Sequence, residues 1–264
     1  MFEHAVVAAD LSANWPSLLE RLPRLRRAGI RRLTLIHVLP RGMPGTARQD
    51  HQLTAEASEQ LQQAVDWLTE QGFIVTHEVL MGEPSVAIDD YLEQTDASLV
   101  VVGRHSHGRL HTFFRGSTLY DLARSAGRPI WLEPLDTEPT NDDGPLLLAT
   151  NASEGARSAE QRARELQSGY ETAIALIVDE GQPAPDKQAA VQRIETRLPG
   201  FKARVENGKV AHVIDTVARE TGAALIVLGR SSHGSLLELL WGSTAEQIFL
   251  RPPTSVLLIP SGPA

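Results

Sequence analysis

The stretch Gly103 to Thr118 reads GRHSHGRLHTFFRGST, and a close copy, GRSSHGSLLELLWGST, spans Gly229 to Thr244. Each stretch directly follows an apolar run, SLVVV in the first case and ALIVL in the second. A glycine at the end of a buried parallel strand lets the backbone turn, so that successive N–H groups point beyond the sheet. Open α/β sheets bind their ligands at this edge. The pattern therefore predicts a binding loop that occurs twice.

The similarity between the two halves extends beyond these stretches, so the chain is a tandem repeat. At an offset of 126 residues, VLMGEPSVAIDDYLEQTDASLVVVGR (79–104) aligns with VENGKVAHVIDTVARETGAALIVLGR (205–230), and Gly82 falls on Gly208. At an offset of 141 residues, AVVAADLSANW (5–15) aligns with LLLATNASEGA (146–156). The first copy therefore carries about 15 extra residues, which we place in a loop after His37, PRGMPGTARQDHQ.

Short apolar runs alternate with amphipathic stretches in both copies. Continuous apolarity indicates strands covered on both faces; the predicted strands are AVVAAD, LTLIHVL, SLVVVG and PIWLEP, then LLLAT, AIALIV, ALIVLG and TSVLLIP. Helical spacing of apolar residues predicts helices between them, carried by Leu61, Ala64, Val65 and Leu68, by Ile88, Tyr91 and Leu92, and by Val210, Val213, Ile214 and Val217. The alternation predicts an α/β fold with two similar domains, each an open parallel sheet of about five strands with helices on both faces.

The segment that joins the two copies, EPLDTEPTNDDGP (133–145), is rich in prolines and acidic residues. Such a composition suits a surface linker. We place the domain boundary near Asp142, which gives a first domain of residues 1–142 and a second of residues 143–264.

A second group of small residues, GST, begins a predicted helix in each copy, STLYDLARSAG and STAEQIFLR. Serine is a favoured N-cap, and the free amides of a helix N-terminus attract anions. The strand-end glycine and GST would therefore hold one polyphosphate from two sides. The alternative interpretation is that these glycines serve only tight turns; the identical spacing in both copies favours binding.

Two familiar phosphate loops are excluded. The G-x-x-x-x-G frame that begins at Gly103 is followed by Arg109 and Leu110, where a Walker loop has Lys and Ser or Thr. No G-x-G-x-x-G follows a predicted strand, so the sequence gives no support for dinucleotide binding of the Rossmann type.

Composition limits the classes of function. The net charge of -8 argues against a general binder of nucleic acid or anionic membranes, because both need a basic surface. The absence of cysteine excludes disulfides, thiolate nucleophiles and cysteine-ligated metals. No apolar run approaches the roughly 18 residues of a membrane span, and the start of the sequence, MFEHAVVAADLS, lacks the pattern of a signal peptide. We therefore expect a cytoplasmic protein.

For the other residue clusters we predict structural roles rather than metal binding or catalysis. His105, His107 and His111 have a spacing that a metal site could use, but no carboxylate lies among them and only His107 has a counterpart, His233. We predict no metal site. Asp89 and Asp90 lie on a predicted helix and form its solvent face, and Trp15, Trp67, Trp131 and Trp241 are core or interface anchors. We predict no catalytic residue.

Taken together, these motifs resemble those of a tandem member of the universal stress protein family, over nearly all residues except the linker. The family's nucleotide-binding members carry G-x2-G-x9-G-(S/T) after the fourth strand, an Asp at the end of the first strand and a Gly at the start of the preceding helix. The matching residues are Gly103, Ser106, Gly116, Ser117, Asp10 and Gly82 in the first copy, and Gly229, Ser232, Gly242, Ser243, Asn151 and Gly208 in the second. Both copies depart from the pattern at the second glycine, where Ser106 and Ser232 stand.

The resemblance implies that the ligand is ATP or AMP, with or without Mg, and that adenine lies between strand ends. In the first copy it implies a nucleotide site formed by Asp10, Leu11, Ser12, His37, Val38, Gly82, Val102, Gly103, Arg104, Ser106, His107, Gly108, Gly116, Ser117 and Thr118. In the second copy it implies Asn151, Ala152, Ser153, Val178, Gly208, Leu228, Gly229, Arg230, Ser232, Gly234, Gly242, Ser243 and Thr244. It also implies an internal pseudo-dimer, paired about a pseudo-twofold axis through the last strands, Pro129 to Glu133 and Thr254 to Pro260, and leaves a further homodimer open.

The first hypothesis is an adenine-nucleotide-binding stress-response regulator without efficient catalysis, acting on a protein partner that the sequence does not identify. One alternative is a slow ATP hydrolase or nucleotidyl-transfer enzyme, for which Asp10 is the motif-linked carboxylate. Another is an interaction scaffold that binds no nucleotide. We expect the first copy to bind more tightly, because Arg104, Arg109 and Arg115 lie in its motif without an acid, whereas Arg230 is offset by Glu238 in the second.

Overall fold

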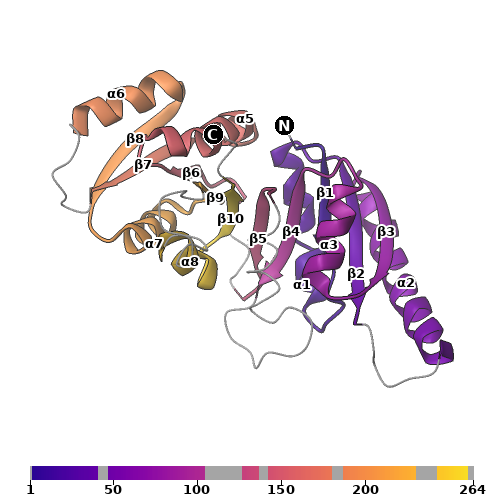
Figure 1. The fold of residues 1–264 in the computed structure, drawn as a ribbon. Helices are drawn as coiled ribbons and strands as arrows, with labels where there is room; N and C mark the ends of the chain where they lie inside the picture. Colours follow the sequence, from indigo (N-terminus) through magenta and orange to yellow (C-terminus); the bar gives the residue numbers. More distant parts are fainter. Residues whose placement is uncertain are drawn as a thin grey trace. The chain divides into compact units, whose positions relative to one another are not determined.

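The computed structural model describes residues 2–40, 47–104, 127–136, 142–179, 187–229 and 243–260. Contacts between residues divide the chain into two compact units, one of residues Phe2–Ile130 and one of residues Trp131–Ala264. Figure 1 draws the first unit in indigo to magenta and the second mainly in orange to yellow. Each unit is an α/β structure in which helices accompany parallel strands.

Four strands of the first unit lie in the order β3-β2-β1-β4. They are β1 (His4–Ala8), β2 (Arg32–Leu39), β3 (Ile74–Met81) and β4 (Leu99–Arg104). All three pairings among them are parallel. Every residue of β1 is buried, which explains its continuous apolarity. The outer strand β3 instead alternates between exposed and half-buried residues.

The helices of the first unit are α1 (Trp15–Leu19), η1 (Leu22–Ala28), α2 (Ala47–Glu70) and α3 (Pro84–Glu93). Helix α2 packs on β2 and β3 and buries Leu61, Ala64 and Leu68 as their spacing predicts. Figure 1 shows α3 in front of the strands and α2 behind them. Our interpretation of residues 40–52 as a loop is wrong at its end, because α2 already begins at Ala47. Much of the insertion therefore lengthens this helix, which has 24 residues against 11 in its counterpart α6.

The second unit has strands in the order β5-β10-β9-β6-β7-β8. They are β5 (Ile130–Pro134), β6 (Leu146–Ala149), β7 (Ala173–Asp179), β8 (Phe201–Asn207), β9 (Leu225–Gly229) and β10 (Ser255–Ile259). Its helices are η2 (Glu154–Ala156), α5 (Arg157–Leu166), η3 (Gln167–Gly169), α6 (Lys187–Arg197), α7 (Val210–Thr221) and α8 (Ser243–Leu250). Strands β6 to β9 repeat the order and the parallel pairing of β1 to β4.

Contacts between residues place the division between the units just before Trp131. The reason is that β5, which follows β4 in the sequence of the first copy, lies beside β10 in the second unit. The pairing of the two last strands is thus found as the family resemblance implies. The amide of Val100 still donates to the Pro129 carbonyl over 3.1 Å, so the residue before β5 contacts β4. The boundary near Asp142 stays a prediction.

All eight predicted strands are present, and predicted helices are found as α2, α3, α7 and α8. The helix predicted from Ser117 lies outside the described residues. Within the described ranges, no helix combines the length and the apolar character needed to cross a bilayer. Trp15 and Trp131 are buried as predicted, and Trp67 is half-buried. Trp241 lies outside the described residues, as do the three histidines of the first motif.

Candidate functional site

In each copy the strand order reverses at the first strand, which lies between the second and the fourth strands. Strand β1 has β2 on one side and β4 on the other, and β6 lies in the same way between β7 and β9. A reversal of strand order opens a crevice at the carboxyl ends of the strands, where α/β sheets bind ligands. Because these strands are parallel, the predicted residues that end them share one edge of each sheet.

The loop that follows β1 has an unusual backbone. The Ser12 amide donates to Asp10 Oδ1 over 3.1 Å, which makes an Asx turn. Between them Leu11 has a φ of 50°, a left-handed conformation that is uncommon for a residue with a side chain. The Asn14 amide donates to the Ser12 hydroxyl over 3.2 Å and continues the turn.

The loop that follows β6 repeats this backbone. The Ser153 amide donates to Asn151 Oδ1, again over 3.1 Å, and Ala152 has a φ of 56°. In the described part of the chain, Leu11 and Ala152 are the residues other than glycine with positive φ. The amide oxygen of Asn151 therefore builds the same turn as the carboxylate of Asp10, without its charge.

His37 lies near the end of β2, directly beside the first loop. Its side chain is buried, and Nδ1 donates to the Ala9 carbonyl over 2.8 Å. Burial lowers the pKa of His37, against opposing effects from the Ala9 hydrogen bond and the charge of Asp10. Strand pairing places Ile177, also buried, at the corresponding position of the second sheet. Val178 corresponds to Val38, so the imidazole has no equivalent there.

The predicted glycines after the third strands adopt a conformation that favours glycine. Gly82 has a φ of 155° and Gly208 a φ of 136°. Their amides donate to equivalent carbonyls at the end of the neighbouring strand, Leu39 at 2.8 Å and Asp179 at 3.0 Å. Both glycines therefore hold the same turn into a helix, α3 in the first unit and α7 in the second.

The residue that follows each of these glycines is acidic in the first copy and basic in the second. Glu83 is the N-cap of α3, where its carboxylate accepts the Val86 amide over 3.0 Å and the hydroxyl of Ser85. Lys209 is the N-cap of α7 and makes no side-chain cap. The backbone at these two caps is alike, so the edges of the two sheets differ in charge and not in shape at this point.

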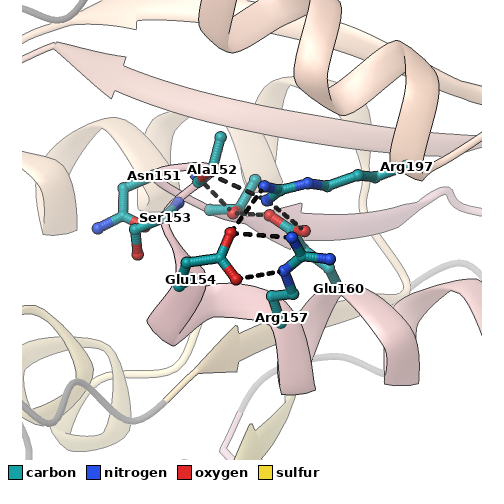
Figure 2. A network of polar contacts seen from close by, with 8 residues as sticks. Asn151, Ala152, Ser153, Glu154, Arg157, Glu160 and Arg197 are labelled. Carbon is teal, nitrogen blue, oxygen red and sulfur yellow. Dashed lines mark hydrogen bonds and ion pairs between the residues drawn. The ribbon is translucent and has the colours of Figure 1, made fainter.

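The second loop is held by a polar network that the sequence did not reveal (Figure 2). At its centre is Glu160 of α5, a buried carboxylate. Oε1 accepts the Thr150 hydroxyl over 2.8 Å, and Oε2 accepts Arg197 Nη1 over 3.2 Å. Arg197 also donates to the Ala152 carbonyl over 3.2 Å, and Thr150 Oγ1 accepts the Ala152 amide over 3.0 Å. Both polar backbone groups of the left-handed residue are therefore fixed.

Glu154 closes the outer side of this network. Arg157 donates to its two oxygens over 2.7 Å and 2.9 Å, and Arg197 lies 3.3 Å from Oε1. The Arg157 hydrogen bonds lower the pKa of Glu154, and Arg197 adds a smaller effect in the same direction. At the repeat offset, Ala9 and Leu19 stand where Thr150 and Glu160 stand. The first loop cannot form this network.

A second unpredicted cluster lies at the opposite, amino edge of the first sheet. His4 Nδ1 donates to Asp96 Oδ1 over 2.7 Å, and Nε2 lies 2.9 Å from the Thr34 hydroxyl. Arg32 pairs with the other oxygen of Asp96, and its hydrogen bond, followed by that of His4, lowers the pKa of Asp96 to about 2. The cluster resembles a nucleophile triad, but Thr34 is only 1% exposed. It therefore ties the strand starts together and offers no accessible hydroxyl.

The remaining predicted residues are described only in part. Val102 and Leu228 are buried near the ends of β4 and β9, and Gly103, Arg104 and Gly229 follow them. Helix α8 begins at Ser243, so the Ser and Thr of GST are the first two residues of a helix in the second copy, as predicted, and Thr244 is half-buried within it. Ten predicted residues lie outside the described ranges: Ser106, His107, Gly108, Gly116, Ser117, Thr118, Arg230, Ser232, Gly234 and Gly242. Among the described residues, no group of three or more His, Asp or Glu could hold a metal ion.

Solved structures of the same architecture cover nearly the whole chain. A universal stress protein from Archaeoglobus fulgidus matches with a TM-score of 0.80 and 19% identity, over 98% of this chain and 96% of its own. A functionally unknown protein from Pseudomonas aeruginosa matches with a TM-score of 0.71 and 14% identity, over 98% and 93%. The cytoplasmic domain of a prokaryotic cation chloride cotransporter matches with a TM-score of 0.58 and 10% identity, over 98% and 95%. These identities establish a shared fold alone.

The sequence itself decides the family. No curated protein matches the chain. The family model described as the universal stress protein family matches it twice, over residues 1–134 and again over residues 136–260. The chain therefore belongs to the universal stress protein family and carries two of its domains in tandem.

Proposed function

We propose that this protein binds an adenine nucleotide, ATP or AMP, at the carboxyl edge of its sheets and works as a stress-response regulator rather than as an efficient enzyme. The observation that carries the proposal is the turn after the first strand of each copy. A left-handed residue other than glycine costs about 1 to 2 kcal/mol, yet both Leu11 and Ala152 adopt this conformation. Strain of this kind clusters at functional sites.

The first copy offers the better site for a nucleoside. Asp10 is half-buried beside the strained turn, and a carboxylate there can accept hydrogen bonds from the exocyclic amine of adenine or from ribose hydroxyls. Hydrogen bonds to a charged acceptor are the stronger kind, about twice as strong as neutral ones. His37, whose pKa is lowered by burial, adds a neutral imidazole next to this carboxylate.

In the second copy, the scaffold hypothesis is supported by a specific feature. Arg197, Glu160 and Thr150 already satisfy the polar groups that hold the Ala152 turn. A loop that is fixed by its own side chains does not need a ligand to order it. We infer that the second crevice either binds more weakly or serves as a rigid scaffold for the first.

The direct test is to identify what the protein carries when purified. Denaturation of the purified chain followed by mass spectrometry should release an adenine nucleotide in an amount close to one per chain or less. The matched control is Asp10→Asn, because Asn151 shows that asparagine builds the same turn. The variant should remain folded and release much less nucleotide. Equal amounts from both proteins would remove Asp10 from the site, and no nucleotide from either, together with no uptake of added ATP, would contradict the proposal.

A further inference from the structure

A buried carboxylate lies where the last strands of the two copies meet within the second unit. Glu133, in β5, is 2% exposed. Its Oε2 accepts the indole N–H of Trp131 over 2.9 Å and the hydroxyl of Ser255, the first residue of β10, over 2.7 Å. Trp131 and Glu133 are two residues apart on one strand and share a face. The carboxylate therefore joins its own strand to the neighbouring strand β10.

This contact depends on which strand lies beside β5. Burial of a carboxylate is unfavourable unless donors surround it, and Ser255 is such a donor at 0% exposure. At the offset of 126 residues that aligns the copies, Glu133 corresponds to Ile259 and Ser255 corresponds to Pro129. The equivalent positions in the other copy are thus both apolar, and the polar contact can form only once.

The same correspondence shows what would happen in other pairings. If two β5 strands from separate chains paired in this register, Pro129 would stand in the place of Ser255. Proline has neither a hydroxyl nor an N–H to donate. If two β10 strands paired, the Ser255 hydroxyl would face Ile259 and would lose its acceptor. In the first of these like-with-like pairings the buried Glu133 keeps the Trp131 indole but loses the Ser255 donor, and in the second the buried Ser255 hydroxyl loses its carboxylate acceptor.

We propose that the hydrogen bond between Ser255 and Glu133 makes β5 specific for β10 and prevents chains from associating through two identical last strands. The last strands are apolar, and an uncovered edge of this kind readily pairs with another chain. Shape and hydrophobicity alone would therefore allow all three combinations. A buried polar pair discriminates among them because each wrong partner removes the hydrogen bond between its two members.

Stability of the full chain tests the contact itself. Ser255→Val should lower the equilibrium constant for folding about tenfold or more, because a buried carboxylate loses a donor. The matched control is Thr254→Val, which removes the neighbouring buried hydroxyl from the neutral Ala224 carbonyl and should cost less. The double variant Glu133→Ile with Ser255→Val should lose less than the two single changes combined, because the hydrogen bond between these residues is removed only once, while the Trp131 indole loses its acceptor equally in both variants that lack Glu133. If the double variant loses as much as the two single changes combined, the contact has no coupling and the proposal fails.

Self-association of the full chain tests whether Glu133 and Ser255 determine which strand pairs with β5. In the double variant neither Glu133 nor Ser255 is present, so like-with-like pairing no longer costs their hydrogen bond, and the Trp131 indole lacks its Glu133 acceptor in every pairing alike. Sedimentation velocity over a range of concentrations should show more dimers and larger species than the parent chain forms under the same conditions. Thr254→Val should behave like the parent. An unchanged distribution of species in the folded double variant would show that Glu133 and Ser255 do not select the partner strand.

Discussion

The amide of Ser12 donates to Asp10 Oδ1 across 3.1 Å, and the residue between them is left-handed. The same relationship joins Ser153 to Asn151 at the same distance in the second copy. An uncharged side chain can therefore build this turn. The charge of Asp10 is not needed for the fold of the loop, so it can be varied separately from the turn.

Substitution of Asp10 by asparagine should separate structure from binding. Asp10→Asn should leave the urea midpoint of unfolding nearly unchanged and should weaken ATP binding about tenfold, the cost of losing a charged acceptor. Asp10→Ala should weaken binding further and also destabilise the fold, because it removes the Ser12 hydrogen bond. Equal stability of the asparagine and alanine variants would show that the Asx turn contributes nothing.

The glycine before α7 should tolerate no side chain. Gly208 has a φ of 136°, and a Cβ there would lie 3.2 Å from Val213 Cγ2. Gly208→Ala should therefore destabilise the protein by about 1 to 3 kcal/mol. Gly127→Ala is the control, because nothing lies within 4 Å of a Cβ at that position. Urea unfolding of both variants measures this loss. If Gly208→Ala and Gly127→Ala lower the free energy of unfolding by similar amounts, a side chain does not strain the conformation of Gly208.

Sequence patterns predicted the buried strands and missed the outer ones. Strands β1, β4, β6 and β9 are covered on both faces and appear as continuous apolar runs. Strands β3 and β8 lie at the outer ends of the strand order and mix exposed with half-buried residues. Their composition, IVTHEVLM and FKARVEN, reflects this partial exposure, so no apolar run marks them.

The residues that form the turns of the site could be predicted from the sequence. The side chains that hold these turns in place could not. Gly82 was found because it recurs as Gly208 at the repeat offset, and Asp10 because the resemblance to universal stress proteins implies an acidic residue at the end of the first strand. Arg197 reaches the Ala152 carbonyl from a helix that lies 45 residues away in the sequence, and no local pattern records such a contact. The same holds for Glu133 and Ser255, which are separated by 122 residues.

The network around Ala152 should make the second loop rigid. Arg197→Met removes the charged partner of buried Glu160 and should cost about 2 kcal/mol. The amides of Ala152 and Ser153 should then exchange with deuterium faster than in the parent, while those of Leu11 and Ser12 should not change. Arg157→Met is the control, because Arg157 contacts the exposed Glu154 rather than Glu160. If these amides exchange at the same rate in Arg197→Met as in the parent, the turn does not depend on Arg197 for its rigidity.

The buried imidazole of His37 should make stability depend on pH. Its pKa is lowered from the ordinary value of 6.5, so the unfolded chain binds the proton more tightly than the folded one. The contribution of His37 is therefore complete above pH 6.5 and is lost as the pH falls through this value toward the lower pKa of the folded state. Urea unfolding between pH 8 and pH 5 should show a smaller loss in His37→Asn, whose amide can still donate to Ala9. An identical pH dependence in both proteins would assign the effect to other groups.

Titration calorimetry of the full chain with ATP tests the central proposal most directly. We predict one dominant binding event, lost in Asp10→Ala and retained in Asn151→Ala, because the first copy keeps its carboxylate at the strained turn and the second copy does not. Two equivalent sites, or a site lost only through Asn151→Ala, would contradict the assignment to the first copy. No saturable heat from the folded parent chain with either ATP or AMP, after any bound nucleotide has been removed, would contradict nucleotide binding itself.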